Sequence, residues 1–279
     1  MAIPEELFSK EKIKKIAELD FENDVLIIGF PRTGTTWLQE LIWIIQHDGD
    51  LDQASKVQVG CRVPFLESRG YDWEHCVYDL DQHPHPRVMK SHLTADFFQS
   101  KLDKLKLIVS IRNPKDTIVS MYNYFKMWKS LPFEMTMENL IEVFVGNRPF
   151  ASNSEDFNYF SWYLKVVPIL GHENVMLVKY EDQKKDLNNK IREIADFLGK
   201  HLDETIIDAI VEHCSFKKLK ENAMVNQTGH EIYDQTKGNF FHKGQVGTWK
   251  ELLTEEQSKL IDDKYEMTLK KAGMELEFD

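Results

Sequence analysis

The segment from Gly29 to Thr36 has the residue types of a phosphate-binding loop. It overlaps the end of the apolar run "DVLIIGF" and reads G-x-x-x-x-G-T-T, so Thr35 stands where a nucleotide-triphosphate loop has its lysine. Backbone N–H groups at the start of the next helix would face an anion, Gly34 would let the backbone approach it, and Arg32 adds positive charge. An ordinary strand-to-helix turn is the alternative reading. The missing lysine disfavours a triphosphate hydrolase.

Strand-like and helix-like patterns alternate along the chain and would position this loop. Apolar, β-branched runs predict strands at residues 24–30, 87–92, 105–114 and 175–182, the third of which ends at a helix start. Amphipathic patterns predict helices at 35–47, from Pro114 onward, and at 188–199, where Gly199 would close the helix. The alternation predicts an α/β fold with a central parallel sheet and helices on both faces. Because no linker or repeat divides the chain, residues 1–279 are expected to form one domain.

Composition and charge exclude several classes of protein. Hydrophobic residues make up 42% of the chain and charged residues 29%, as in ordinary globular proteins. The net charge of −11 argues against general binding to nucleic acid or to an anionic membrane, so an anionic ligand requires a local basic pocket. The apolar runs are too short to span a bilayer, and the charged N-terminus does not resemble a signal peptide. A cytoplasmic protein is expected.

The three cysteines, Cys61, Cys76 and Cys214, are scattered and form no C-x-x-C pair. Their number and spacing favour reduced thiols over a disulfide framework, and they do not indicate a zinc site. Nothing else in the sequence indicates a metal-binding site.

Three motifs, in this order, resemble those of the cytosolic sulfotransferases. "PRTGTTW" from Pro31 is similar to the loop P-K-S-G-T-T-W, which those enzymes use for 3′-phosphoadenosine 5′-phosphosulfate (PAPS). "SIRNPKDTIVS" from Ser110 resembles their 3′-phosphate segment, and "HKGQVGTWK" from His242 resembles their R-K-G-x-x-G-x-W. "VPFLE", "KSHL", "YED" and "SFKKLKENAM" fit between them, so the resemblance covers nearly the whole chain. It implies the P-loop-like sulfotransferase fold.

The resemblance implies direct transfer of a sulfuryl group, with His92 as the general base. An imidazole with an ordinary pKa near 6.5 suits a base that works at neutral pH. Lys90, two residues earlier, falls on the same face of a strand as His92 and would stabilise charge in the transition state. Arg32 replaces the usual lysine; it keeps the positive charge but does not release a proton as a lysine can. A hydrogen-bonded structural histidine is the alternative for His92.

The same resemblance implies a cofactor site for PAPS and its product PAP, 3′-phosphoadenosine 5′-phosphate. Arg112 and Ser120 match the 3′-phosphate ligands, while Asn113 and Asp116 are expected to organise the helix start. His242 replaces an arginine, a loss of about 1–3 kcal/mol of binding unless something compensates. The implied cofactor residues are Arg32, Thr33, Gly34, Thr35, Thr36, Trp37, Arg112, Ser120, Tyr180, Cys214, Ser215, Phe216, His242, Lys243 and Gly244, with Trp37 and Phe216 sandwiching the adenine.

The acceptor is less well defined by the sequence. Phe65 and Tyr124 match positions that line the acceptor site together with His92, and aromatic walls suit a small apolar phenol, alcohol or sterol-like molecule. Ser68 falls where many relatives carry an aromatic residue, which predicts a roomier or more polar cleft. In the stretch 250–259, Glu255 and a lysine replace a valine and a glutamate of the family's dimer motif. A monomer or a weak homodimer is therefore expected.

Two other functions compete with this interpretation. A nucleotide kinase or other P-loop phosphotransferase would need a lysine at the position of Thr35. A PAP- or PAPS-binding protein with little turnover would keep the fold while the changes at Arg32 and His242 weakened the site. The presence of His92 favours an enzyme, because a binding protein has no chemical need of that base.

Overall fold

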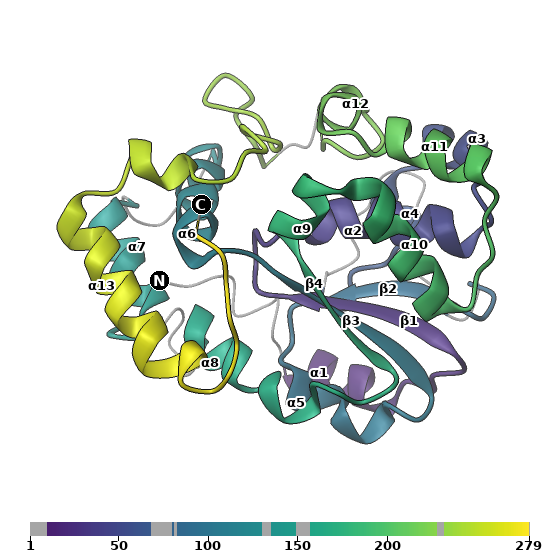
Figure 1. Ribbon diagram of the computed structural model, residues 1–279, viewed down its shortest axis with the longest axis horizontal. Helices are drawn as coiled ribbons and strands as arrows, with labels where there is room; N and C mark the ends of the chain where they lie inside the picture. Colours follow the sequence, from purple (N-terminus) through teal and green to yellow (C-terminus); the bar gives the residue numbers. More distant parts are fainter. Residues whose placement is uncertain are drawn as a thin grey trace.

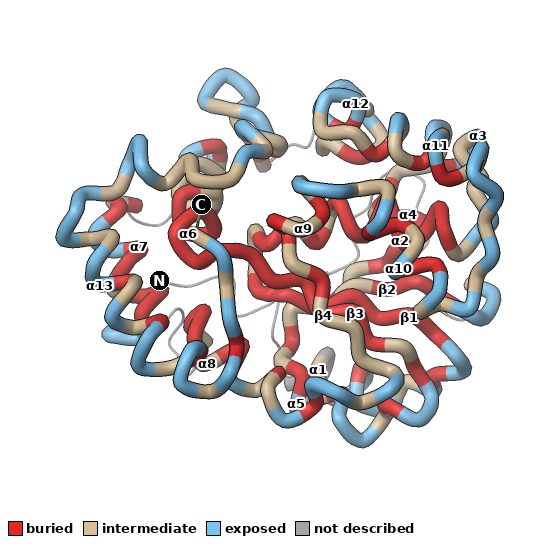
Figure 2. Tube along the Cα trace, viewed as in Figure 1, coloured by how far each residue is buried: buried red, intermediate tan, exposed pale blue. Residues whose placement is uncertain are grey.

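The fold is built on four parallel strands in the order β2-β1-β3-β4. A computed structural model describes residues 10–67, 80, 83–129, 135–148, 157–227 and 232–278 (Figure 1). The strands are β1 (Asp24–Gly29), β2 (Val88–Ser91), β3 (Leu105–Ile111) and β4 (Val175–Lys179). Their apolar runs have no polar alternation, as expected for strands covered on both faces, and Figure 2 shows β1 and β3 buried along their length. The predicted parallel sheet is confirmed.

Helices cover both faces of the sheet. The helical segments are α1 (Lys10–Glu18), α2 (Thr35–Gln46), α3 (Leu51–Lys56), α4 (Val59–Arg62), α5 (Ala95–Phe98), η2 (Gln99–Lys101), α6 (Pro114–Lys126), α7 (Met137–Phe144), α8 (Tyr159–Leu164), η3 (Val167–Ile169), α9 (Tyr180–Lys185), α10 (Leu187–Leu198), α11 (Glu204–His213), α12 (Phe216–Glu221), η4 (Thr248–Glu251), α13 (Glu255–Tyr265) and η5 (Glu266–Lys270).

Two hydrophobic clusters fill the space between the sheet and the helices, one on each face of the sheet. Val25 and Ile27 pack into a cluster with α2, α10 and α11, whereas their neighbours Leu26 and Ile28 pack into a second cluster with α5, α6, α7, α8 and α13. This alternation follows from the two-residue period of a strand. In Figure 1, α2, α9 and α10 lie on one side of the sheet and α1, α5 and α8 on the other.

The predicted strands at 105–114 and 175–182 are wrong at their ends, because β3 ends at Ile111 and β4 at Lys179. The ladder between β3 and β4 ends at the pair Ile111 and Lys179, and the helix α9 begins at Tyr180. Beyond Lys179 the neighbouring strand offers no partner, and Glu181 and Asp182 suit the first turn of a helix. The predicted closure of α10 is confirmed, since Gly199 takes the left-handed conformation with φ 71°.

The prediction of reduced thiols is wrong at one position. Cys61 is disulfide-bonded, while Cys214 is a free thiol and is entirely buried. Cys76 and Ser68 lie outside the described residues.

The described ranges of the chain contain no helix long and apolar enough to cross a membrane. The same ranges contain no group of three or more His, Cys, Asp or Glu side chains that could hold a metal ion.

Candidate active site

A cavity of about 300 Å³ lies at the carboxyl ends of the strands, the edge of a parallel sheet where ligands bind. The structure brings most of the predicted site residues to its wall. These are Arg32, Gly34, Thr35, Thr36, Trp37, Phe65, Lys90, His92, Arg112, Ser120, Tyr124, Tyr180, Phe216, His242, Lys243 and Gly244. Thr33, Cys214 and Ser215 are not among the lining residues. The Thr33 hydroxyl instead donates to the carbonyl of Phe30 at 2.7 Å.

The loop between β1 and α2 is shaped by its glycines. Gly34 has φ 99°, and a Cβ there would lie 2.8 Å from a ring carbon of Tyr180, so a side chain would both strain the backbone and clash. At Gly29 a Cβ would lie 2.9 Å from the Thr33 hydroxyl. The loop is therefore packed closely against β3 and α9, and its next turn opens helix α2.

Arg32 joins this loop to two distant segments. Its φ of 73° lies in the left-handed region, which for a residue with a side chain costs about 1–3 kcal/mol. The guanidinium carbon lies 4.6 Å from the ring centroids of both Tyr124 and Phe240. Nη2 donates to the Phe240 carbonyl at 2.8 Å and Nε donates to Ser120 Oγ at 3.3 Å. Burial lowers the pKa of Arg32.

His92 is oriented by the phosphate-binding loop. Its Nδ1 lies 2.6 Å from the carbonyl oxygen of Gly29. Because a carbonyl only accepts, Nδ1 carries the proton and Nε2 keeps its lone pair. Burial and the nearby positive charge of Lys90 lower the pKa of His92 well below its ordinary value. The imidazole is therefore neutral at physiological pH and able to accept a proton.

Glu67 holds the backbone beside His92. One carboxylate oxygen accepts from the His92 N–H at 2.5 Å, from the Leu93 N–H at 3.0 Å and from the Ser91 hydroxyl at 3.0 Å. Burial raises the pKa of Glu67 to about 7. Glu67 ends the segment "VPFLE", but the sequence does not predict its role, because a fully buried carboxylate has no signature in one sequence.

Lys90 lies between an aromatic ring and this carboxylate. Its amino group is 4.4 Å from the ring centroid of Phe65, and the backbones of the two residues pair as a parallel bridge. Burial lowers the pKa of Lys90 to about 8, against the opposing attraction of Glu67. Lys90 and His92 both line the cavity, as their two-residue spacing predicted.

Arg112 and Ser120 lie in the cavity wall at the end of β3 and in α6. The Arg112 guanidinium carbon is 4.2 Å from the ring centroid of Tyr180, and Nη2 donates to the carbonyl of Gln245 at 3.2 Å. Its Nε is buried without a hydrogen-bond partner. Nearby, Lys243 pairs with Glu251.

The start of α6 anchors the segment that follows His242. Asn113 caps α6 by accepting from the Lys115 N–H at 2.8 Å, as predicted. Asp116 does something different: its carboxylate accepts from the N–H of Gly247 at 2.8 Å, the N–H of Trp249 at 3.0 Å and the Thr248 hydroxyl at 2.9 Å. These contacts fix the loop that the motif "HKGQVGTWK" contributes to the cavity.

Aromatic rings border a slot at the other end of the cavity. The Lys184 amino group lies 5.9 Å from the ring centroid of Trp37 and 5.5 Å from that of Phe216, so both rings face the same space. Tyr180 meets Trp37 edge to face, with centroids 5.5 Å apart. Gly244 lies so close to Phe216 that a Cβ there would be 2.0 Å from a ring carbon. Two aromatic rings that face one space offer the kind of surface on which a planar base stacks.

The wall near Tyr124 is also aromatic. Tyr124 and Tyr233 share a hydrogen bond between their hydroxyls at 2.8 Å, and the rings of both lie beside Phe240. The sequence predicted Tyr124 and Phe65 for this wall but not Trp128, Phe157, Tyr233 or Phe240, which also line the cavity. These residues lie far apart along the chain and come together only when it folds.

Positive groups crowd this cavity although the whole chain is acidic. Burial lowers the pKa of Lys184, with Arg112 adding to the effect. Burial and the charge of Lys243 lower the pKa of His242. Groups that disfavour one another's charge gain most from a bound anion, so the wall is suited to a ligand with several negative charges.

The chain is similar to known sulfotransferases along most of its length. Residues 22–273 match the family model for the sulfotransferase domain. The chain is 38% identical over 250 residues to sulfotransferase 1A1 of Mus musculus, covering 87% of this chain and 83% of that protein. It is 34% identical over 263 residues to sulfotransferase 1C2 of Oryctolagus cuniculus, covering 92% and 86%.

Solved structures show the same fold. A retinol dehydratase in complex with androsterone and the inactive cofactor PAP superimposes with a TM-score of 0.80 at 24% identity, covering 93% of this chain and 86% of that one. Mouse sulfotransferase SULT7A1 complexed with PAP gives a TM-score of 0.72 at 23% identity, covering 95% and 90%. With a family model spanning most of its length and relatives above 30% identity, the chain belongs to the sulfotransferase family.

Proposed function

We propose that this protein transfers the sulfuryl group of PAPS directly to a hydroxyl or amine of a small apolar acceptor, with His92 as the base. The contact between His92 Nδ1 and the Gly29 carbonyl at 2.6 Å carries the proposal. It leaves Nε2 as the basic nitrogen of a residue in the wall of a cavity that also holds Lys90 and Arg32. Proton acceptance and charge stabilisation are thereby combined at one site.

The roles of the remaining residues follow from their positions. By analogy with phosphoryl transfer, the reaction needs in-line positioning and neutralisation of charge on the leaving oxygens. Lys90 and Arg32 would stabilise the bridging and sulfuryl oxygens. The backbone and hydroxyls of Thr35 and Thr36 would hold the 5′-phosphate at the start of α2. The slot between Trp37 and Phe216 would hold the adenine.

The 3′-phosphate would bind where α6 meets the loop after His242. Arg112 and Ser120 lie in the wall there with Lys243 and Gly244. The buried, unpartnered Nε of Arg112 offers a donor to such a ligand. Thr33, Cys214 and Ser215 would act indirectly, by packing and capping.

For the acceptor, the aromatic wall supports a phenol, an alcohol or a sterol-like molecule. Phe65 and Tyr124 line the cavity with Phe240, which suits a planar or otherwise apolar body. Androsterone and retinol, named in complexes of retinol dehydratase, are both of this kind.

We further propose that residues 1–279 form one sulfotransferase domain that works in the cytoplasm. We also expect a monomer or a weak homodimer. In the stretch that replaces the family's dimer motif, Lys259 pairs with Asp263 of the same helix at 2.7 Å.

Calorimetric titration with PAP, compared with ATP plus magnesium, tests the cofactor. We expect PAP to bind clearly more tightly. A preference for ATP would support a kinase instead, and binding of neither ligand would leave a sulfotransferase fold without its cofactor.

The variant His92→Ala tests the base. Transfer from PAPS to a panel of phenols and sterols should fall at least about 100-fold, while the Kd for PAP stays within about twofold of wild type. His201→Ala is the matched control, because His201 is exposed. Loss of PAP binding together with transfer would show that His92 is structural.

A further inference from the structure

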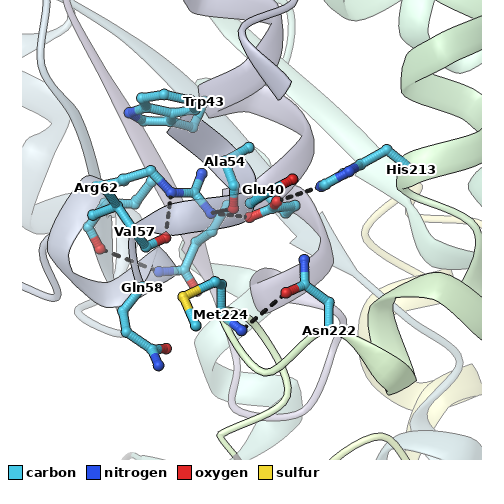
Figure 3. A network of polar contacts seen from close by, with 12 residues as sticks. Glu40, Trp43, Ala54, Val57, Gln58, Arg62, His213, Asn222 and Met224 are labelled. Atoms are coloured by element: carbon cyan, nitrogen blue, oxygen red, sulfur yellow. Dashed lines mark hydrogen bonds and ion pairs between the residues drawn. The ribbon is translucent and has the colours of Figure 1, made fainter. Parts of the chain in front are cut away.

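A buried cluster of charged side chains lies outside the cavity, behind helix α2. Its centre is Glu40, whose side chain is fully buried. One carboxylate oxygen accepts from Arg62 Nη2 at 2.5 Å and the other from His213 Nε2 at 2.8 Å (Figure 3). None of the three residues lines the cavity, so the proposed chemistry does not use them directly.

The three residues come from elements that lead to three different walls of the cavity. Glu40 lies one helical turn after Thr36 of the phosphate-binding loop. Arg62 ends α4, three residues before Phe65. His213 ends α11, three residues before Phe216, which borders the aromatic slot.

Helix α12 carries Phe216 and Leu219 into the cavity wall. It is connected at its start to α11, which ends at His213, and beyond its end to α4, which ends at Arg62. At its start, Ser215 caps the helix directly after α11 has ended at His213. Beyond its end, the carbonyl of Met224 accepts from the N–H of Val59 at 2.8 Å. The carbonyl of Ala223 accepts from the side chain of Gln58 at 3.2 Å.

Contacts of Arg62 with neighbouring residues hold helix α4 in place. Its Nε donates to the Val57 carbonyl at 2.9 Å and Nη2 donates to the Ala54 carbonyl at 3.3 Å. The guanidinium carbon lies 4.6 Å from the Trp43 ring centroid (Figure 3). Helix α12 is therefore held between a fixed α4 and the link from His213 to Glu40.

We infer that Glu40 and His213 are positioning residues of the nucleotide site: their hydrogen bond sets the place of α12 and so the distance of Phe216 from Trp37 across the slot. The inference rests on the proposed binding of PAP. Base stacking needs two rings at a defined separation, and the start of α12, where Phe216 lies, follows directly on the end of α11, where His213 lies.

A substitution of His213 can distinguish an effect on the position of α12 from a loss of protein stability. Removing Arg62 would leave a buried carboxylate without its ion partner and would threaten folding. Removing the His213 imidazole leaves the ion pair of Glu40 with Arg62 intact, and the His213 side chain is already 14% exposed. We therefore choose His213→Ala, with His213→Gln as the rescue, because a glutamine amide can donate to the same carboxylate oxygen.

The experiment measures the Kd for PAP, the KM for PAPS, kcat and the unfolding temperature of each variant, with His201→Ala as the control. For His213→Ala we expect the Kd for PAP and the KM for PAPS to rise about tenfold, with kcat at saturating PAPS within about twofold. His213→Gln should recover most of the affinity. Ribose 3,5-bisphosphate, which lacks the base, should bind wild type and His213→Ala equally.

The outcomes separate this inference from the function on which it rests. Wild-type protein that fails to bind PAP contradicts both. Wild-type protein that binds PAP, with an unchanged Kd and only a lower unfolding temperature in His213→Ala, contradicts the inference alone. An equal loss of affinity for PAP and for the baseless ligand would also overturn it, because the effect would then not pass through Phe216.

Discussion

The carboxylate of Glu67 accepts the backbone N–H of His92 at 2.5 Å, so the candidate base is held by a buried acid that approaches it from another segment. The same acid raises the pKa of Lys90 against the effect of burial. One residue thus both places the base and keeps the neighbouring lysine charged.

Glu67→Gln should shift the alkaline limb of the rate profile toward lower pH. The glutamine keeps an oxygen acceptor for the His92 N–H but removes the negative charge that raises the pKa of Lys90. That pKa of about 8 should fall, so the charged lysine is lost at a lower pH. The pH dependence of kcat measures this. Glu67→Ala, which also removes the acceptor, should lower kcat further, and an unchanged limb in Glu67→Gln would mean that Lys90 does not set it.

Glu181→Gln should stabilise the protein at alkaline pH. Glu181 accepts the Asn113 N–H at 2.9 Å, and burial raises its pKa from 4.5 to about 7. The folded state therefore holds a proton that the unfolded state releases, and stability falls as pH rises from about 4.5 to about 7. We expect the variant to gain about 3 kcal/mol at pH 8 and nothing at pH 4. Urea unfolding at the two pH values tests this; a gain that is equal at both would contradict it.

His242→Arg should tighten PAP binding. His242 is exposed, and its lowered pKa leaves it neutral at pH 7, whereas an arginine would bring a permanent charge to the proposed 3′-phosphate corner. Calorimetry should show about tenfold tighter binding with a steeper dependence on salt. His201→Arg adds the same charge at an exposed position and should change little. If both variants behave alike, the residue does not face the phosphate.

Asp116→Asn should loosen the loop from His242 to Trp249. The carboxylate accepts three hydrogen bonds from Gly247, Thr248 and Trp249, and an asparagine offers a single oxygen. We expect about tenfold weaker PAP binding and a loss of about 1–3 kcal/mol in stability. Asp262→Asn, which alters only the partly exposed pair with Lys115, is the control and should leave PAP binding unchanged.

The fold class and the residue types of the site could be predicted from the sequence alone. The alternation of apolar runs and amphipathic helices predicted the parallel sheet, because periodicity is a local property of the chain. The loop after β1 and the spacing of Arg112 and Ser120 could also be recognised in the sequence. The prediction was wrong at the end of β4 because a strand ends where its neighbour stops pairing, and the strand's own residues do not specify the length of that neighbour.

The contacts between side chains of different elements became known only from the folded structure. The contacts of Glu67 with His92, of Arg32 with Phe240, of Asp116 with Trp249 and of Glu40 with His213 each join residues from separate elements. The carbonyl of Phe278, near the end of the chain, likewise accepts from Asn113 and from Trp249. Such contacts depend on which surfaces meet when the layers pack, and residue spacing along the chain does not predict them. The sequence specifies the residue types, and the packing of the layers sets how the side chains are oriented toward one another.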